Sequence, residues 1–178
     1  MLIATLNVAV VMFGLFLFGQ AGLSKLARPL VYQTVMQGYL KSYLNRPVSV
    51  WMVRAVGVIE LDAGVALLFP QTSAMAMAVC AGLLLMYAWL MWRQLAAGQT
   101  HLRCGCGGAD SDTKVSRELV VRNVLVALPF ALLAFDTSGG VALPEIGVGL
   151  GLAAILIFSY QAVDGLIANR QRWQGAQV

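Results

Sequence analysis

The sequence predicts an all-α, polytopic membrane bundle, and three observations point to that fold class. Hydrophobic residues make up 60% of the 178 residues, whereas Asp, Glu, Lys and Arg together make up only 11%. A soluble domain carries about 25% charged residues, so this chain lacks the charge to cover a water-facing surface. Its apolar residues also gather in runs long enough to cross about 30 Å of hydrocarbon as helices. An ordinary cytosolic enzyme and a disordered chain are thereby excluded.

Five apolar stretches are expected to span the bilayer, four of them as a core bundle and the fifth as an addition to it. They are Leu2–Leu23, Ser49–Phe69, Ser73–Trp92, Leu119–Phe135 and Ile146–Ile167. The first stretch has no basic residue ahead of its apolar run, and the run exceeds the usual length of a signal-peptide core. We therefore interpret it as a retained helix, and expect residues 1–178 to form a single membrane domain.

The segment Pro29–Leu44 is too short and too polar to span the bilayer. Pro29 suits the first position of a helix, and Asn45-Arg46-Pro47 is a typical stop signal. Apolar residues recur between these points near helical spacing, with glutamines and a lysine between them. The pattern predicts an amphipathic helix that lies flat in the headgroup region with its tyrosines at the boundary. The alternative is a simple connection between two spans.

The distribution of charge bears on partners and on orientation. The net charge of +4 comes from basic residues scattered between apolar runs. A nucleic-acid-binding domain needs a continuous basic patch, so the expected surroundings are lipid headgroups and not nucleic acid. The connections Pro70–Thr72 and Phe135–Pro144, at one edge of the expected bundle, contain no Lys or Arg. The basic residues collect at the opposite edge. The positive-inside rule assigns that basic edge, with the loop Arg93–Glu118, to the cytoplasm.

The loop Arg93–Glu118 is the longest polar connection, and it contains two cysteines one residue apart, Cys104 and Cys106, among glycines. A disulfide between them would close a small ring that only a flexible glycine tolerates, and its strain would make the bond easily reduced. His101, Arg103 and the start of the following helix are positioned to stabilise a thiolate. The pattern favours redox-active cysteines that exchange disulfides with a partner.

Two other interpretations of this loop stay open. Cys104, Cys106 and His101 are soft metal ligands, although the fourth ligand that structural zinc sites need is not apparent, so the leading prediction includes no metal. Alternatively, the two cysteines are incidental to a flexible loop. The remaining cysteine, Cys80, lies among alanines and leucines in the third span, where we expect it to pack as a small hydrophobic residue.

Glu60 lies near the middle of the second span, where the bilayer makes a charge expensive. It is expected either to accept a proton released by thiol oxidation or to pair with another polar residue, as intramembrane charges usually do. The candidate partners are Arg122, Arg54 and Asn123. Glu118 and Arg122 also stand four residues apart with the acid first, which is the favourable orientation for a pair on one helix.

The fifth span carries two further features. Gly147–Gly151 presents small residues at a spacing that predicts close helix packing. Asp164 is a carboxylate late in the span, and the sequence identifies no partner for it.

Four short motifs match a known membrane family. They are Ala21–Lys25 after the first span, Ile59–Leu61 in the second, Cys104–Gly108 in the polar loop and Leu119–Asn123 at the start of the fourth. On these motifs the sequence resembles the methylamine-utilisation protein MauE family, within the wider DoxX-like membrane proteins. The family pattern joins a CxC pair to a helix that begins with an Arg-Asn pair, and both are present. One departure is Gly107, where the family tends to have an aromatic residue.

The resemblance implies a role in the maturation of methylamine dehydrogenase, a periplasmic quinoprotein whose small subunit is dense in disulfides. It also implies MauD, a thioredoxin-like periplasmic protein, as a partner. The family chemistry places the cysteine loop on the periplasmic side of the bacterial inner membrane, against the positive-inside bias. The arrangement is also similar to vitamin K epoxide reductase, which implies a quinone as acceptor of electrons from Cys104 and Cys106.

The prediction is therefore a multi-pass membrane thiol–disulfide oxidoreductase, or an essential membrane component of one, with Cys104 and Cys106 as its catalytic pair. The supporting residues are His101, Arg103, Glu60, Arg122 and Asn123. The alternatives are a non-enzymatic membrane anchor or scaffold for the thioredoxin-like partner, and a membrane protein that binds a metal through the CxC pair and histidine.

Overall fold

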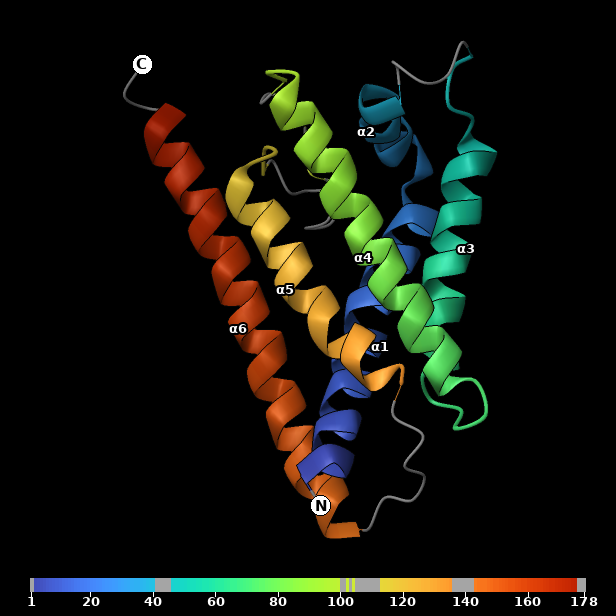
Figure 1. The fold of residues 1–178 in the computed structure, drawn as a ribbon. Coiled ribbons are helices and arrows are strands. Elements are labelled where there is room, and N and C mark those ends of the chain that lie inside the picture. Colours follow the sequence, from blue (N-terminus) through green and yellow to red (C-terminus); the bar gives the residue numbers. More distant parts are fainter. Residues whose placement is uncertain are drawn as a thin grey trace.

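The computed structural model describes residues 2–40, 46–99, 102, 104, 113–135 and 143–175, so the predicted end of the second helix at residues 41–44 lies outside it. The described part of the chain forms six helices and no strand, which confirms the predicted all-α membrane bundle. In Figure 1, α2 lies at the end of the bundle opposite the N-terminus. The helices are α1 (Leu2–Ala27), α2 (Pro29–Leu40), α3 (Val50–Ala66), α4 (Ser73–Ala96), α5 (Arg117–Leu133) and α6 (Leu143–Gly175).

Three segments of the described helices are long and apolar enough to cross a membrane, and they are Leu2–Ala27, Ser73–Ala96 and Pro144–Trp173. The helices α3 and α5 have 17 residues each. At 1.5 Å per residue they reach roughly 25 Å, slightly less than the ~30 Å of hydrocarbon. The chain is therefore a multi-pass membrane protein, and α3 and α5 are shorter than the three segments that meet the length for a span.

The helix α2 begins at its predicted proline, and it packs against the segment that leads into α3. Gln33 Nε2 donates to the carbonyl oxygen of Val48 at 2.7 Å, and the Val48 N–H donates to Gln37 Oε1 at 2.5 Å. Tyr32 and Tyr39 are buried within the bundle, although the sequence pattern predicted tyrosines at the lipid boundary. The glutamines hold the helix against α3, so its tyrosine face turns inward.

Glycines bring α1 and α3 into close contact. A Cβ atom on Gly22 would lie 2.6 Å from the carbonyl oxygen of Gly57. A Cβ atom on Gly57 would lie 3.1 Å from the Cβ of Lys25, so the absence of a side chain there lets Lys25 lie against α3. The last turns of α1 are thereby set beside the middle of α3.

We expect Gly22→Ala to lower the free energy of unfolding by roughly 1–3 kcal/mol, because the added methyl group meets backbone that no rotamer change can move. Thermal unfolding of the purified protein in one detergent measures the effect. Gly19→Ala is the matched control on the same helix, because a Cβ atom there meets nothing within 4 Å. Equal losses in the two variants would contradict the close contact of α1 with α3.

Cys80 is fully buried in the main hydrophobic core, which also contains Phe18 and Phe130. The two phenylalanine rings meet edge to face, with centroids 6.1 Å apart. The thiol of Cys80 thus packs as a small hydrophobic group between helices, as the sequence predicts.

The glycine motif of α6 makes one close contact with α1. A Cβ atom on Gly149 would lie 2.7 Å from Val8 Cβ, whereas at the other two glycines of the motif it would meet nothing within 4 Å. The predicted close packing therefore applies to Gly149.

Candidate functional site

The cysteine loop turns Cys104 into the bundle. The N–H of Cys104 donates to the carbonyl oxygen of Thr113, and the N–H of Val115 donates to that of Leu102, both at 2.9 Å. These two hydrogen bonds tie the segment that precedes the glycines to the segment that leads into α5. Cys104 is only 8% exposed, and its Sγ lies 3.7 Å from Met91 Sδ on α4. Its thiol therefore faces protein and not water.

Three of the predicted site residues, Cys106, His101 and Arg103, lie outside the described residues. The cysteine pair and its two basic neighbours accordingly stay predictions. Within the described ranges, no group of three or more His, Cys, Asp or Glu side chains is placed to hold a metal ion. The metal alternative depends on Cys106 and His101, and it stays a prediction.

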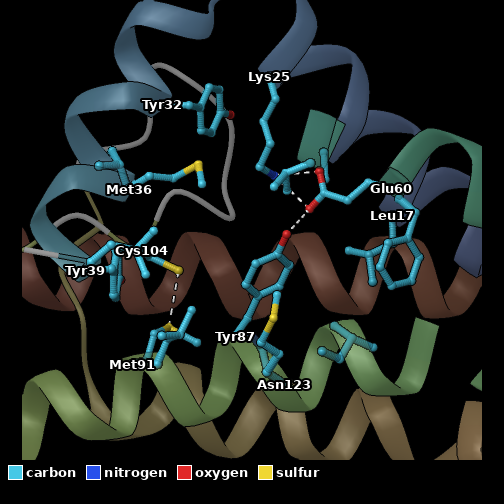
Figure 2. A pocket seen from close by; sticks show the side chains of 18 of the residues that line it. Leu17, Lys25, Tyr32, Met36, Tyr39, Glu60, Tyr87, Met91, Cys104 and Asn123 are labelled. Carbon is cyan, nitrogen blue, oxygen red and sulfur yellow. Dashed lines mark hydrogen bonds and ion pairs between the residues drawn. The ribbon is translucent and has the colours of Figure 1, made fainter. Parts of the chain in front are cut away.

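Cys104 lines a cavity of 310 Å³ whose wall is built mainly by α1, α2, α3 and α4. Figure 2 shows Tyr32 and Tyr39 of α2 on one side of this cavity, and Lys25 and Glu60 on the other. Most of the remaining wall is leucine, valine, methionine and phenylalanine. A few polar groups thus meet inside an otherwise apolar space.

Lys25, Glu60 and Tyr87 form a buried polar cluster at one wall of this cavity. Lys25 Nζ donates to both carboxylate oxygens of Glu60, at 2.8 and 2.7 Å. The Tyr87 hydroxyl donates to Glu60 Oε1 at 2.5 Å. Glu60 is 0% exposed, so its charge depends on these two partners and not on water.

One face of α4 connects the polar cluster with the thiol. Tyr87, which holds Glu60, and Met91, which contacts Cys104, are four residues apart and therefore lie on successive turns of the same face. One turn advances about 5.4 Å along the helix axis. The carboxylate and the thiol consequently border one space, as Figure 2 shows.

The prediction that Glu60 pairs with Arg122, Arg54 or Asn123 is wrong, because Lys25 and Tyr87 take its carboxylate. Lys25 is one of the basic residues that the sequence predicts beside lipid headgroups. Its long side chain instead reaches back into the bundle. Asn123 is buried and lines the same cavity as Glu60, so two of the predicted supporting residues do come together.

The spacing of glycines and charges along the sequence could have predicted the ion pair of Lys25 with Glu60. Phe18, Gly22 and Lys25 are spaced by four and three residues, so they share one face of α1. Gly57 and Glu60 share a face of α3 in the same way. A glycine on each helix, followed three residues later by a charge of opposite sign, is the pattern of two helices in close contact with an ion pair beside it.

Arg122 serves another ion pair, between α5 and α6. Its guanidinium contacts the carboxylate of Asp164, and its Cζ lies 4.6 Å from the ring centroid of Tyr160. Arg122 Nη2 also donates to Asn123 Oδ1 at 3.0 Å. Asp164, for which the sequence identified no partner, thus joins α6 to the Arg-Asn pair of the fourth span.

The predicted pair of Glu118 with Arg122 is also wrong. Glu118 Oε1 lies 3.4 Å from Arg170 Nη1, and both side chains are exposed. An exposed ion pair of this kind contributes at most about 1 kcal/mol, so it adds little to the attachment of α6.

A family model described as methylamine utilisation protein MauE matches residues 2–136. The comparisons with curated proteins and with solved structures found no match. The matched segment contains Cys104 and the whole cluster of Lys25, Glu60 and Tyr87, whereas α6 follows it.

Proposed function

Since the chain belongs to the methylamine utilisation protein MauE family, we propose that it is the membrane component of a thiol–disulfide oxidoreductase. In this proposal Cys104 and Cys106 are the reacting pair, and the product is the set of disulfides in the small subunit of methylamine dehydrogenase. A periplasmic thioredoxin-like protein of the MauD kind carries the disulfide to that client. The loop that contains these cysteines lies on the periplasmic side of the bacterial inner membrane.

The observation that carries the proposal is the position of Cys104. Its thiol lines an apolar cavity that also contains a buried lysine, carboxylate and phenol. A cysteine with only a packing role, such as Cys80, lies among apolar side chains alone. The boundary between a polar loop and a cavity with ionisable groups suits the inner cysteine of a redox pair, whose neighbour Cys106 reacts with the partner.

The exchange needs no reagent beyond the two proteins. A thiolate of the reduced partner attacks the Cys104–Cys106 disulfide at Cys106, the S–S bond breaks, and Cys104 leaves as a thiolate. The second partner thiolate then attacks the mixed disulfide, so the partner is oxidised and both cysteines end reduced. Attack at Cys106 follows from the burial of Cys104, whose Sγ faces α4.

A single-cysteine trapping experiment tests this assignment. In Cys104→Ser, Cys106 can attack an oxidised partner but no resolving cysteine remains, so a mixed disulfide is expected to accumulate. Cys106→Ser leaves only the buried thiol and is expected to give little or none. Non-reducing gels of membranes that contain the thioredoxin-like protein measure the adduct. Absence of an adduct in both variants, with partner binding retained, would favour the alternative of a non-enzymatic scaffold.

A further inference from the structure

The cavity is bordered by Cys104 and by side chains of α1, α2, α3 and α4. Its volume of 310 Å³ falls at the lower end of ligand pockets, which span about 300–1,000 Å³ and combine apolar walls with a few placed polar groups. We propose that this cavity binds a lipid-soluble quinone, with Lys25, Glu60 and Tyr87 as its polar end. The assignment rests on the proposed function, for which it names the electron acceptor.

The electron balance of the cysteine pair defines the chemistry of this ligand. When Cys104 and Cys106 form a disulfide, two S–H bonds break, one S–S bond forms, and two electrons and two protons leave. A quinone takes up both electrons and both protons as its two carbonyls become hydroxyls. The cavity wall is mostly apolar, so it favours an apolar acceptor with a few polar atoms over a highly charged, water-soluble one.

The walls of the cavity offer an approach from the lipid. Met52 of α3 and Met86 of α4 line the cavity, yet they are 39% and 42% exposed on the outside of the bundle. Methionine side chains are flexible, so they can move to admit an apolar molecule. These two methionines therefore suit the approach of a ligand that arrives through the bilayer.

The polar cluster supplies what a quinone carbonyl needs. The Lys25 ammonium has three N–H bonds, and the two oxygens of Glu60 account for two of them. The third is able to donate to a carbonyl oxygen, and the positive charge stabilises that oxygen as it gains electrons. Glu60 and Tyr87 orient the ammonium and hold it in the cavity.

The ring of the quinone fits between the cluster and the thiol. Tyr32 and Tyr39 of α2 present aromatic side chains to the cavity, and such rings pack well against another flat ring. Tyr87 and Met91 on α4 are four residues apart, about 6 Å along the helix axis, and the cluster and Cys104 line one cavity, so a ring held at the cluster shares that space with the thiol. The same cavity thus brings an electron acceptor to the buried cysteine.

Binding is tested on the full chain in lipid nanodiscs with a decyl-benzoquinone that carries a photoreactive diazirine. Saturable crosslinks are expected on α2, α3 and α4 at the cavity wall, and unlabelled decyl-benzoquinone should compete for them. Val35→Phe, which fills the cavity from α2, should weaken binding roughly tenfold or more. Val31→Phe is the matched control, because Val31 is exposed one turn earlier on α2, and its affinity should not change.

The outcomes separate this inference from the proposed function. Mixed-disulfide trapping without saturable quinone binding overturns the quinone site and leaves the disulfide chemistry standing. Saturable quinone binding without mixed-disulfide trapping overturns the disulfide chemistry and leaves the quinone site standing. Crosslinks confined to the outer face of α6, or equal effects of the two valine variants, also overturn the site. Anaerobic titration should further give one quinol formed for each two thiols lost.

Discussion

Lys25→Met is expected to lower the free energy of unfolding by about 3–5 kcal/mol, because it leaves a buried carboxylate without its counter-charge. Glu60 is 0% exposed, and its carboxylate accepts two hydrogen bonds from Lys25. After the substitution, the hydrogen bond from the Tyr87 hydroxyl is the one that remains within the described cluster. The loss should exceed that of Gly22→Ala. Chemical unfolding in a single detergent, followed by helical circular dichroism, measures it.

A double variant shows whether the loss comes from the unpaired charge. Lys25→Met combined with Glu60→Gln removes both charges and keeps the side chains close to their native volumes, so most of the lost stability should return. Lys114→Met is the matched control, because Lys114 is an exposed lysine on the loop side of α5. If the double variant were no more stable than Lys25→Met alone, the ion pair would not be the source of the effect.

Cys106→Ser is expected to abolish disulfide formation in the small subunit of methylamine dehydrogenase, down to the level of cells that lack this protein. A serine hydroxyl can neither attack a disulfide nor form one, so the exchange with the thioredoxin-like partner stops at its first step. The state of the client is measured by thiol alkylation followed by mass spectrometry. Expression of the variant in the membrane is measured in parallel.

Cys80→Ala is the matched cysteine control for that experiment. Cys80 lies in the hydrophobic core, so its loss costs some packing but should leave client disulfides at the wild-type level. Normal client disulfides in Cys106→Ser would refute the proposed chemistry and favour the scaffold. Equal loss in both variants would show that the effect comes from folding and not from the cysteine pair.

The fold class and the elements of the bundle were predictable because each depends on local properties of the chain. Apolar runs of bilayer length predict membrane helices whatever their neighbours are, and Pro29 marks the start of α2 by its own geometry. The family was also evident from short motifs, and the match over residues 2–136 confirms it. The inward turn of the α2 tyrosines was missed, because it depends on the glutamines that bond to Val48.

Composition, apolar runs and short motifs are enough to identify a helical membrane protein of the MauE family with a cysteine loop between two spans. Which charges meet inside the bundle depends on how its helices pack. Glu60 pairs with Lys25, 35 residues earlier, because two glycines let α1 and α3 approach. Arg122 forms an ion pair with Asp164 on α6 and not with Glu60. A buried charge takes the partner that helix packing brings within hydrogen-bond reach, and the spacing of glycines and charges along one helix does not by itself specify which helix packs against it.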